Sequence, residues 1–413
     1  MRARVLMTAG LVACVLAGSG PALAGDPRGG TDDRSGRSAS GADRPQHTSD
    51  NQPGWIAPPV SARGRSYRIE GTSWQVVPGV TYSTWTQIDA VRAAQAHLLV
   101  IDPKAPGVRL DYADAGSVRR VKTVREILAV DGAVAGVNAD FFDIGRTGAP
   151  LGLGQDRQRG LLHGRSSGWN SAFYLDKQGR PQIGELPMTV KILNHPEIAV
   201  TGLNQPSVPA DSVGLYTRAW GRTAGYRMTQ GQKKGVRAVW INRGKVERVR
   251  RALKADKPVT GRLLIGRGVG ARQLAALKPG DRVRTSAWLY GQPKVAVTGN
   301  KLLVDDGVVK VADNRELHPR TAIGIDHDTG LVLMVVIDGR SESSSGYTMV
   351  DLANLMIDLG ADEALNFDGG GSSTMVGTPP GGVSTVLNSP SDGSERRVTN
   401  ALEVIYRPPA ARH

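Results

Sequence analysis

The sequence contains one cysteine, few aromatic residues and no long apolar run after its N-terminal segment. The single cysteine is Cys14, and aromatic residues make up only 5% of the chain. With no second cysteine, an internal disulfide is excluded, so stability outside the cell would have to come from a large core. No later segment approaches the roughly 18 apolar residues that a membrane helix requires, which argues against an integral membrane span.

Residues 1–24 have the anatomy of a signal peptide. Two arginines precede the apolar run Val5–Leu16, and Ala22-Leu-Ala24 is a typical cleavage site. We therefore expect a secreted, extracellular protein. The alternative is a lipoprotein anchored through Cys14, because Leu11-Val-Ala-Cys14 has the form of a lipobox.

The chain is strongly basic, with a formal net charge of +14 at pH 7. Outside the cell, basicity favours anionic partners such as a phosphate-bearing cell-wall polymer, although dispersed charge can also serve solubility alone. Nucleic-acid binding is not expected, because the basic residues are scattered and no stacking-aromatic motif is present.

The chain divides by composition into a leader, a linker and one large folded region. Residues 25–61 are rich in Gly, Ser, Asp, Arg and Pro, which predicts a disordered polar linker. We assign residues 62–407 to a single domain, in which about 200–310 would be an inserted β-rich subdomain, and 408–413 to a tail.

Alternating and β-branched runs dominate the folded region, so the predicted class is α+β: a mixed, sheet-rich domain with a few helices packed on the sheet. The predicted helices cover 124–130, 271–277 and 348–359. The predicted strands cover 96–101, 108–112, 134–137, 236–241, 262–265, 283–289, 321–325, 331–337, 364–367, 374–376 and 401–405.

Two aspartate-glycine turns follow predicted strands near the C-terminus. The strand at 331–337 ends in Asp338-Gly-Arg340, and the strand at 364–367 ends in Asp368-Gly-Gly-Gly-Ser-Ser373. The helix at 348–359 lies between them, which predicts a βαβ crossover near the C-terminus. Both aspartates would then emerge at one edge of the sheet, where open α/β sheets bind ligands.

The residues around these turns suit a carboxylate site beside a phosphate site. Glycine allows the backbone to approach a ligand closely, and the glycines with Ser372 and Ser373 could present their N–H groups to an anion. Arg320 and Arg340 would supply guanidinium groups for a phosphate. The absence of a Gly-Lys-Ser/Thr sequence after the glycines excludes a Walker-type nucleotide loop.

A second polar cluster follows the predicted strand at 134–137. It reads Asn138-Ala-Asp140-Phe-Phe-Asp143, and Asn138 and Asp140 are site candidates because they lie where the strand ends. The adjacent phenylalanines are more typical of core packing.

Together these motifs resemble the phosphodiester glycosidase family, which includes the lysosomal enzyme that uncovers mannose 6-phosphate and many bacterial exopolysaccharide-associated proteins. The resemblance covers residues 67–406. It is carried by Asn138-Ala-Asp-Phe-Phe142, Gly148-Ala-Pro-Leu-Gly152, His318-Pro-Arg-Thr-Ala-Ile-Gly324, Val336-Ile-Asp-Gly-Arg340, Asn366-Phe-Asp-Gly-Gly-Gly-Ser-Ser373 and Arg397-Val-Thr-Asn-Ala401.

The resemblance implies a hydrolase that cleaves the glycosidic bond of a sugar-1-phosphodiester, such as an α-N-acetylglucosamine phosphodiester of a cell-wall or exopolysaccharide-type substrate. Such chemistry needs a carboxylate near the anomeric carbon and a base that activates water. The catalytic candidates are Asp368, Asp338 and Asp140. The substrate-binding candidates are Asn138, Arg320, Thr321, Arg340, Asn366, Gly369, Gly370, Gly371, Ser372 and Ser373.

Two other functions stay open at this point. One is a non-catalytic module that binds cell-wall phosphopolymers, and the other is a phosphohydrolase in which the aspartates hold a metal. We expect no required cofactor and assign no metal ligand, with a structural divalent cation at the Asp-Gly loops as a further hypothesis.

Overall fold

The computed structural model describes residues 53–409. The predicted signal peptide, Cys14 and residues 410–413 lie outside the described residues. Strands account for 44% of the described residues and helices for 11%, so the prediction of a sheet-rich domain with few helices is confirmed. Within residues 53–409, no helix is long and apolar enough to cross a membrane.

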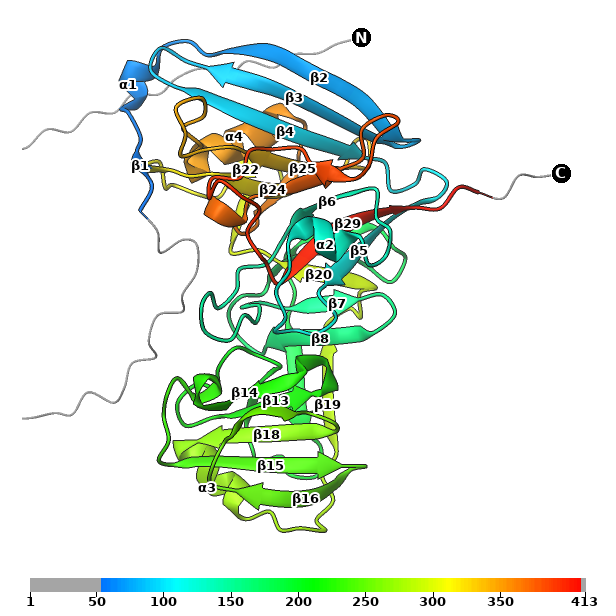
Figure 1. Cartoon of the computed structure of the whole chain (residues 1–413), viewed down its shortest axis with the longest axis vertical. Coiled ribbons are helices and arrows are strands. Elements are labelled where there is room, and N and C mark those ends of the chain that lie inside the picture. The colour runs from blue at the N-terminus through cyan, green and yellow to red at the C-terminus, as the bar shows by residue number, and fades with distance from the viewer. Residues whose placement is uncertain (1–52, 410–413) are drawn as a thin grey trace, which may run out of the picture. The chain divides into compact units, whose positions relative to one another are not determined.

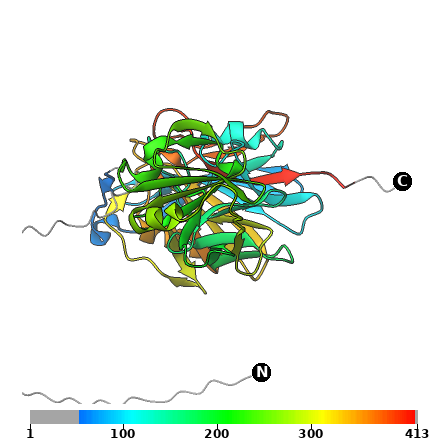
Figure 2. The same ribbon diagram turned by 90° about the horizontal axis from the view of Figure 1, so that it is seen from below.

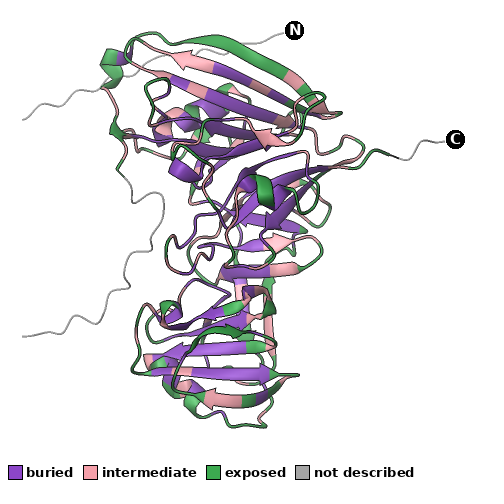
Figure 3. Ribbon diagram, in the orientation of Figure 1, coloured by how far each residue is buried: buried purple, intermediate pink, exposed green. Residues whose placement is uncertain are grey.

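An eight-stranded sheet carries most of the C-terminal motifs (Figure 1). Its order is β2 (Tyr67–Val77), β3 (Val80–Ile88), β4 (Ala93–Ile101), β25 (Leu331–Ile337), β24 (Arg320–Asp326), β26 (Glu363–Asn366), β21 (Lys301–Asp305) and β22 (Val308–Val309). The central strands are buried, whereas the edge strand β2 is largely exposed (Figure 3). Helix α4 (Met349–Asp358) packs on one face through Leu352, Leu355 and Met356.

The opposite face of this sheet packs on a five-stranded sheet. The order of the second sheet is β28 (Thr385–Val386), β27 (Met375–Gly377), β6 (Ala135–Asn138), β29 (Asn400–Tyr406) and β5 (Val108–Asp114). Val336 of the first sheet and Val137 of the second belong to the same core cluster. Helix α2 (Val124–Leu128) covers the outer face through Ile127 and Leu128. The layers are therefore helix, sheet, sheet, helix.

Strands β25 and β26 are not paired with each other, because β24 lies between them and pairs antiparallel with both. The predicted βαβ crossover of neighbouring parallel strands is therefore not confirmed. Both strands nevertheless run in one direction, since each opposes β24. Asp338 and Asp368 consequently follow strand ends at the same edge of the sheet.

A ten-stranded sheet is formed entirely by residues between 154 and 298. Its order is β10 (Pro181–Glu185), β9 (Ser171–Leu175), β20 (Val295–Thr298), β7 (Gly154–Asp156), β8 (Gly160–Arg165), β12 (Val200–Leu203), β13 (Val213–Thr217), β18 (Arg262–Arg267), β15 (Val236–Asn242) and β16 (Lys245–Arg250). Helix α3 (Gly268–Ala275) follows β18 and packs on it (Figure 1). The sheet extends further toward the N-terminus than the predicted subdomain at about 200–310.

Smaller elements complete the fold. The paired strands are β1 (Trp55–Ile56) with β23 (Glu316–Leu317), β11 (Met188–Ile192) with β19 (Thr285–Leu289), and β14 (Arg222–Ala224) with β17 (Ala255–Pro258). The short 3-10 helices are η2 (Arg218–Trp220), η3 (Gly225–Thr229) and η4 (Gly370–Ser372). The described chain leaves the fold after β29 (Figure 2).

Local sequence signals explain where two helices begin. Thr123 and Glu126 form the predicted capping box at the start of α2. An equivalent box at α4 joins Thr348 to Asp351, whose side chain accepts from the Thr348 N–H at 3.2 Å. Helix α4 is followed by Gly360 at φ +92°, which stops it where predicted.

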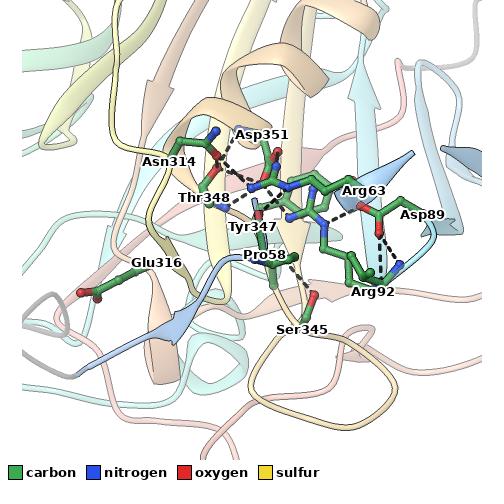
Figure 4. A network of polar contacts seen from close by, with 12 residues as sticks. Pro58, Arg63, Asp89, Arg92, Asn314, Glu316, Ser345, Tyr347, Thr348 and Asp351 are labelled. Carbon is green, nitrogen blue, oxygen red and sulfur yellow. Dashed lines mark hydrogen bonds and ion pairs between the residues drawn. The ribbon is translucent and has the colours of Figure 1, made fainter. Parts of the chain in front are cut away.

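The described part of the predicted linker is structured, so the linker prediction is wrong over residues 53–61. Strand β1 pairs with β23, and helix α1 (Val60–Arg63) follows it. The Arg63 guanidinium donates to Asp351 at 2.9 Å, and Arg92 donates to the other oxygen of Asp351 at 2.8 Å (Figure 4). The amino-acid composition did not predict this structure because the segment is held by the ion pair between Arg63 and Asp351 of α4, a helix that is distant in the sequence.

We expect Asp351→Asn to destabilise the protein at neutral pH by about 3 kcal/mol, because it removes the carboxylate that pairs with Arg63 and Arg92. Burial alone would raise the pKa of Asp351, but hydrogen bonds and charge from Arg92 outweigh it and lower that pKa. The wild-type advantage should therefore be present at neutral pH and disappear as the pH falls below about 4.

Urea denaturation of both proteins at pH 7 and pH 3.5 measures this difference. Asp256 provides the matched control, since it pairs with Arg222 on the surface with 78% of its side chain exposed. Asp256→Asn should leave the unfolding midpoint unchanged. An equal, pH-independent loss in both variants would contradict the assignment.

Candidate functional site

Two Asn-x-Asp segments from different sheets meet edge to edge. The Asp368 N–H donates to the carbonyl of Ala139 at 2.8 Å. In return, the side-chain amide of Asn138 donates to the carbonyl of Asp368 at 2.7 Å. The structure therefore brings Asn138 and Asp140, at the end of β6, next to Asn366 and Asp368, at the end of β26.

Asn138 is fully buried and acts as a clamp between the sheets. Its Oδ1 accepts from the hydroxyl of Thr321 at 2.9 Å and from the N–H of Thr374 at 3.0 Å. The predicted role of Asn138 and Thr321 was substrate binding. These side-chain hydrogen bonds are directed at protein groups and connect both residues to the Asp368 loop and to Thr374.

Asp140 is a buried carboxyl beside Asp368. Its Oδ2 accepts from the Gly152 N–H at 3.0 Å and from the Thr298 hydroxyl at 3.2 Å, whereas its Oδ1 has no hydrogen-bond partner among the described residues. Burial raises the pKa of Asp140 well above its usual value, and the charge of Asp368 adds to this increase. Asp140 is therefore suited to carry a proton at neutral pH.

A buried hydrogen-bond chain holds Asp140 in place from behind. Asn400 accepts the Asp140 N–H at 2.9 Å, and the Tyr112 hydroxyl lies 2.9 Å from Nε2 of His163. Nδ1 of His163 lies 2.9 Å from the carbonyl of Gly152, which can only accept, so Nδ1 carries the hydrogen and Nε2 accepts from Tyr112. Burial lowers the pKa of His163 to about 4, which keeps the ring neutral.

Two predicted basic residues lie at the Asp338 end of the sheet: Arg320 begins β24 opposite Ile337, and Arg340 follows Asp338-Gly339. Arg320 is buried and donates through Nε to the Tyr347 carbonyl at 2.9 Å. Arg340 donates through Nη2 to Nδ1 of His318 at 2.9 Å, so this nitrogen is the unprotonated one. Burial, reinforced by the charge of Arg396, lowers the pKa of the Arg340 guanidinium.

Arg396 also lies at the glycine loop, although the sequence motifs did not predict it as a site residue. It donates to the Ser372 hydroxyl at 3.4 Å and pairs with Asp392 at 2.7 Å. A Cβ added at Gly371 would lie 2.1 Å from the Arg396 guanidinium and 2.3 Å from the Asp392 carboxylate, so these side chains would have to move to admit a larger residue. A sequence signal was present, because Arg396 immediately precedes the Arg397–Ala401 motif.

Some backbone N–H groups of the glycine loop, residues 369–373, already donate hydrogen bonds to carbonyls of the protein. The amide of Gly370 donates to the Pro319 carbonyl at 2.9 Å, and the amides of Ser372 and Ser373 donate to carbonyls within the loop. The predicted anion site would therefore depend on Gly369 and Gly371 and on nearby guanidinium groups. Gly370, at φ +59°, adopts the left-handed conformation that starts η4.

Asp338, the remaining catalytic candidate, is held by hydrogen bonds at both carboxylate oxygens. Its two oxygens accept from the side chain of Asn388 and the N–H of Ser389, each at 3.0 Å, and from His97 at 3.1 Å. Asn388 also donates to the Ser373 carbonyl at 3.1 Å.

Several buried polar atoms around the pair have no hydrogen-bond partner among the described residues. They are Asp140 Oδ1, Asn366 Oδ1, Ser373 Oγ and Thr374 Oγ1. Buried polar atoms in native proteins are nearly always paired, so a group of orphans on two adjoining segments is typical of a site that holds a ligand or water. Within residues 53–409, no cluster of three or more Asp, Glu, His or Cys side chains is placed to hold a metal ion.

Comparison with known proteins supports the family resemblance. Residues 222–405 match the family model of phosphodiester glycosidases. The SPbeta prophage-derived uncharacterized protein YomE of Bacillus subtilis is 41% identical over 96 residues, which are 23% of this chain and 14% of YomE. The aligned segment is thus a small part of that relative.

Two solved structures have the same fold. A hypothetical protein from Synechocystis aligns with a TM-score of 0.65 and 21% identity over 80% of this chain and 62% of its own. A protein described as exported, from Burkholderia pseudomallei, aligns with a TM-score of 0.67 and 19% identity over 86% of this chain and 100% of its own.

We expect Asn138→Ala to lower the free energy of unfolding by about 2–4 kcal/mol, because it removes the buried hydrogen bonds of Asn138 to the Asp368 carbonyl and the Thr374 N–H. Asn194 is the control: it is exposed and makes similar bonds to the backbone of Arg282 and Arg284. Chemical denaturation should show a much smaller effect of Asn194→Ala; equal losses would argue against a clamp.

Asp140→Asn should stabilise the protein at high pH. Because the folded pKa of Asp140 is raised, the wild type keeps its full stability at low pH and loses stability as the pH rises from about 4 through that raised pKa. The variant has no carboxyl group to ionise at this position, so it should lose less stability as the pH rises. Denaturation midpoints at several pH values test this, with exposed Asp328→Asn as control; parallel pH profiles would refute it.

Proposed function

We infer, from the match of residues 222–405 to the phosphodiester glycosidase family, that this protein hydrolyses the glycosidic bond of a sugar-1-phosphodiester. The observation that carries the proposal is the buried Asp140–Asp368 pair, surrounded by polar atoms without protein partners. The substrate class that we propose is an α-N-acetylglucosamine-type phosphodiester of a cell-wall or exopolysaccharide-type polymer.

In the proposed reaction, water attacks the anomeric carbon while the bond between this carbon and the phosphate oxygen breaks. The water supplies the hydroxyl of the free sugar and gives its other proton to an ionised carboxylate, and the bond electrons leave with the phosphomonoester. Two carboxyl groups in different environments suit this chemistry, because one can hold a proton while the other stays ionised. The raised pKa of Asp140 supports its role as the protonated partner, with Asp368 as the carboxylate beside the anomeric carbon.

The phosphate would lie against the guanidinium groups of the loop region. Arg340 and Arg396 are close enough for the charge of Arg396 to lower the Arg340 pKa, so an anion between them would relieve the repulsion of two like charges. Ser372, which accepts from Arg396, and the amides of Gly369 and Gly371 would add neutral donors. A leaving phosphate requires this stabilisation more than a strong acid.

Asp338 would act through the segments that it holds. It fixes Asn388, which is bonded in turn to the Ser373 carbonyl of the glycine loop. Replacement of Asp338 should shift the glycine loop through Asn388 and thereby reduce activity indirectly. Asn366 remains a substrate-binding candidate, since its Nδ2 donates to Asn300 while its Oδ1 has no partner among the described residues.

We also propose that the protein acts outside the cell. The support is the predicted signal peptide and the structural similarity to a Burkholderia protein described as exported. The basic character of the chain suits an anionic polymer as partner.

The decisive experiment is incubation of the protein with an α-N-acetylglucosaminyl phosphodiester, followed by product analysis. We expect free sugar and intact phosphomonoester, formed equally with and without a chelator. Asp368→Asn should reduce turnover by a factor of about 100 or more, because it removes the carboxylate at the reacting carbon.

Asp328→Asn is the matched control, since Asp328 is exposed in the turn at the other end of β24 and should retain wild-type turnover. Wild-type rates in Asp368→Asn would overturn the assignment. Release of inorganic phosphate would favour a metal-dependent phosphohydrolase, and binding without turnover would favour a cell-wall binding module.

A further inference from the structure

A cavity outside the Asp140–Asp368 pair is bordered by Asp338. It has a volume of about 450 Å³ and is lined by side chains from strands β2, β3 and β4 and from the segment after β28. The lining residues that matter below are Thr72, Trp74, Tyr82, Gln95, His97 and Ser389. None of them belongs to the Asp140–Asp368 pair or to the groups proposed to hold phosphate.

The cavity forms where the inner face of the eight-stranded sheet changes from apolar to polar. Along β4, Ile101 and Leu99 face the core, and His97 and Gln95 continue the same face. The exposed edge strand β2 has an irregular register between Glu70 and Ser73, just before Trp74. Such bulges redirect neighbouring side chains, and they occur frequently beside binding sites.

The wall of the cavity is a pair of aromatic rings. Trp74 and Tyr82 lie opposite each other on β2 and β3, with ring centroids 4.3 Å apart. Trp74 is only partly buried, whereas 2% of Tyr82 is exposed. Tyr82 thus supports the indole from below, and the indole offers a rigid apolar surface at low entropic cost.

The floor of the cavity is a hydrogen-bond chain that ends on Asp338. Nε2 of His97 lies 3.1 Å from the Asp338 carboxylate, and Nδ1 lies 2.8 Å from the Tyr82 hydroxyl. With Nε2–H directed at the carboxylate, Nδ1 accepts the Tyr82 hydrogen. Burial raises the pKa of Tyr82 to about 12, so its hydroxyl stays neutral. Tyr82 can then offer oxygen lone pairs as acceptors.

The chemistry of the lining selects for a neutral polar ligand. Among the described residues that line the cavity there is no lysine or arginine, so an anion would find no countercharge. The one carboxylate, Asp338, already accepts from Asn388, Ser389 and His97, so it offers little to a cation. Hydroxyl and amide groups of Thr72, Gln95 and Ser389 surround an aromatic face.

From this lining we propose that the cavity binds a neutral saccharide unit, with one sugar face on Trp74 and its hydroxyl groups on the polar floor. An aromatic platform with a few oriented hydrogen-bonding groups is the arrangement that small-molecule sites use for orientation and specificity. The same Ser389–Asn388 segment that borders the cavity is bonded to the glycine loop. This goes beyond the proposed hydrolysis and does not require it, because the cavity would bind sugar without cleaving it.

The test is isothermal titration calorimetry of the protein with a panel of neutral trisaccharides. The trisaccharides are made of glucose, mannose, galactose or N-acetylglucosamine. At least one should bind saturably. Trp74→Ala should weaken its binding by about tenfold, which is the scale of one aromatic contact. Thr72→Tyr, at an exposed position of the cavity, should block binding without touching the core.

Trp288→Ala is the matched control, because Trp288 is 39% exposed on β19, outside the cavity, and should bind like the wild type. Absence of binding across the panel, or binding that is equal in all variants, would overturn the proposal. Displacement of the bound trisaccharide by glycerol phosphate, which contains no sugar, would also overturn the proposal. Since the readout is binding, a protein without hydrolytic activity that still binds at Trp74 would refute only the proposed function.

Discussion

The candidate site depends on one buried carboxamide. Asn138 ends a strand of the five-stranded sheet, yet its side chain bonds to the Asp368 carbonyl and to Thr321, which belong to the eight-stranded sheet and its following loop. A carboxamide can donate and accept at once, which neither a carboxylate nor an aliphatic side chain can do. The two Asn-x-Asp segments are held together by this property, and the sheet packing beneath them keeps the geometry fixed.

Environment separates the three aspartates that look equivalent in sequence. Burial favours the protonated form of Asp140, whereas Asp338 accepts hydrogen bonds at both oxygens and holds neighbouring segments. Asp368 lies on the glycine loop, where its N–H donates to the carbonyl of Ala139, the residue before Asp140. Similar side chains thus acquire different tasks from the number of donors around them and from the cost of burying charge.

Two buried histidines each connect a tyrosine hydroxyl to a polar group near the site. His163 connects Tyr112 to the Gly152 carbonyl behind Asp140, and His97 connects Tyr82 to Asp338. In both chains the imidazole uses both of its nitrogens, which aligns a tyrosine hydroxyl with a polar group near the site. Neither histidine belongs to a motif, and each is buried by strands from distant parts of the sequence.

Sequence by itself determined what is local: the strand patterns at 331–337 and 401–405, the capping box of Thr123 and Glu126, the stop at Gly360, and the motifs within residues 222–405, the range that matches the family. These follow from side-chain periodicity and from backbone preferences of neighbouring residues. Only the tertiary structure decided that β24 separates β25 from β26, that residues 55–63 join the fold, and that Asp338 supports loops. It also revealed Arg396 and His97, because strand pairing and charge contacts across distant segments leave no periodic pattern in the sequence.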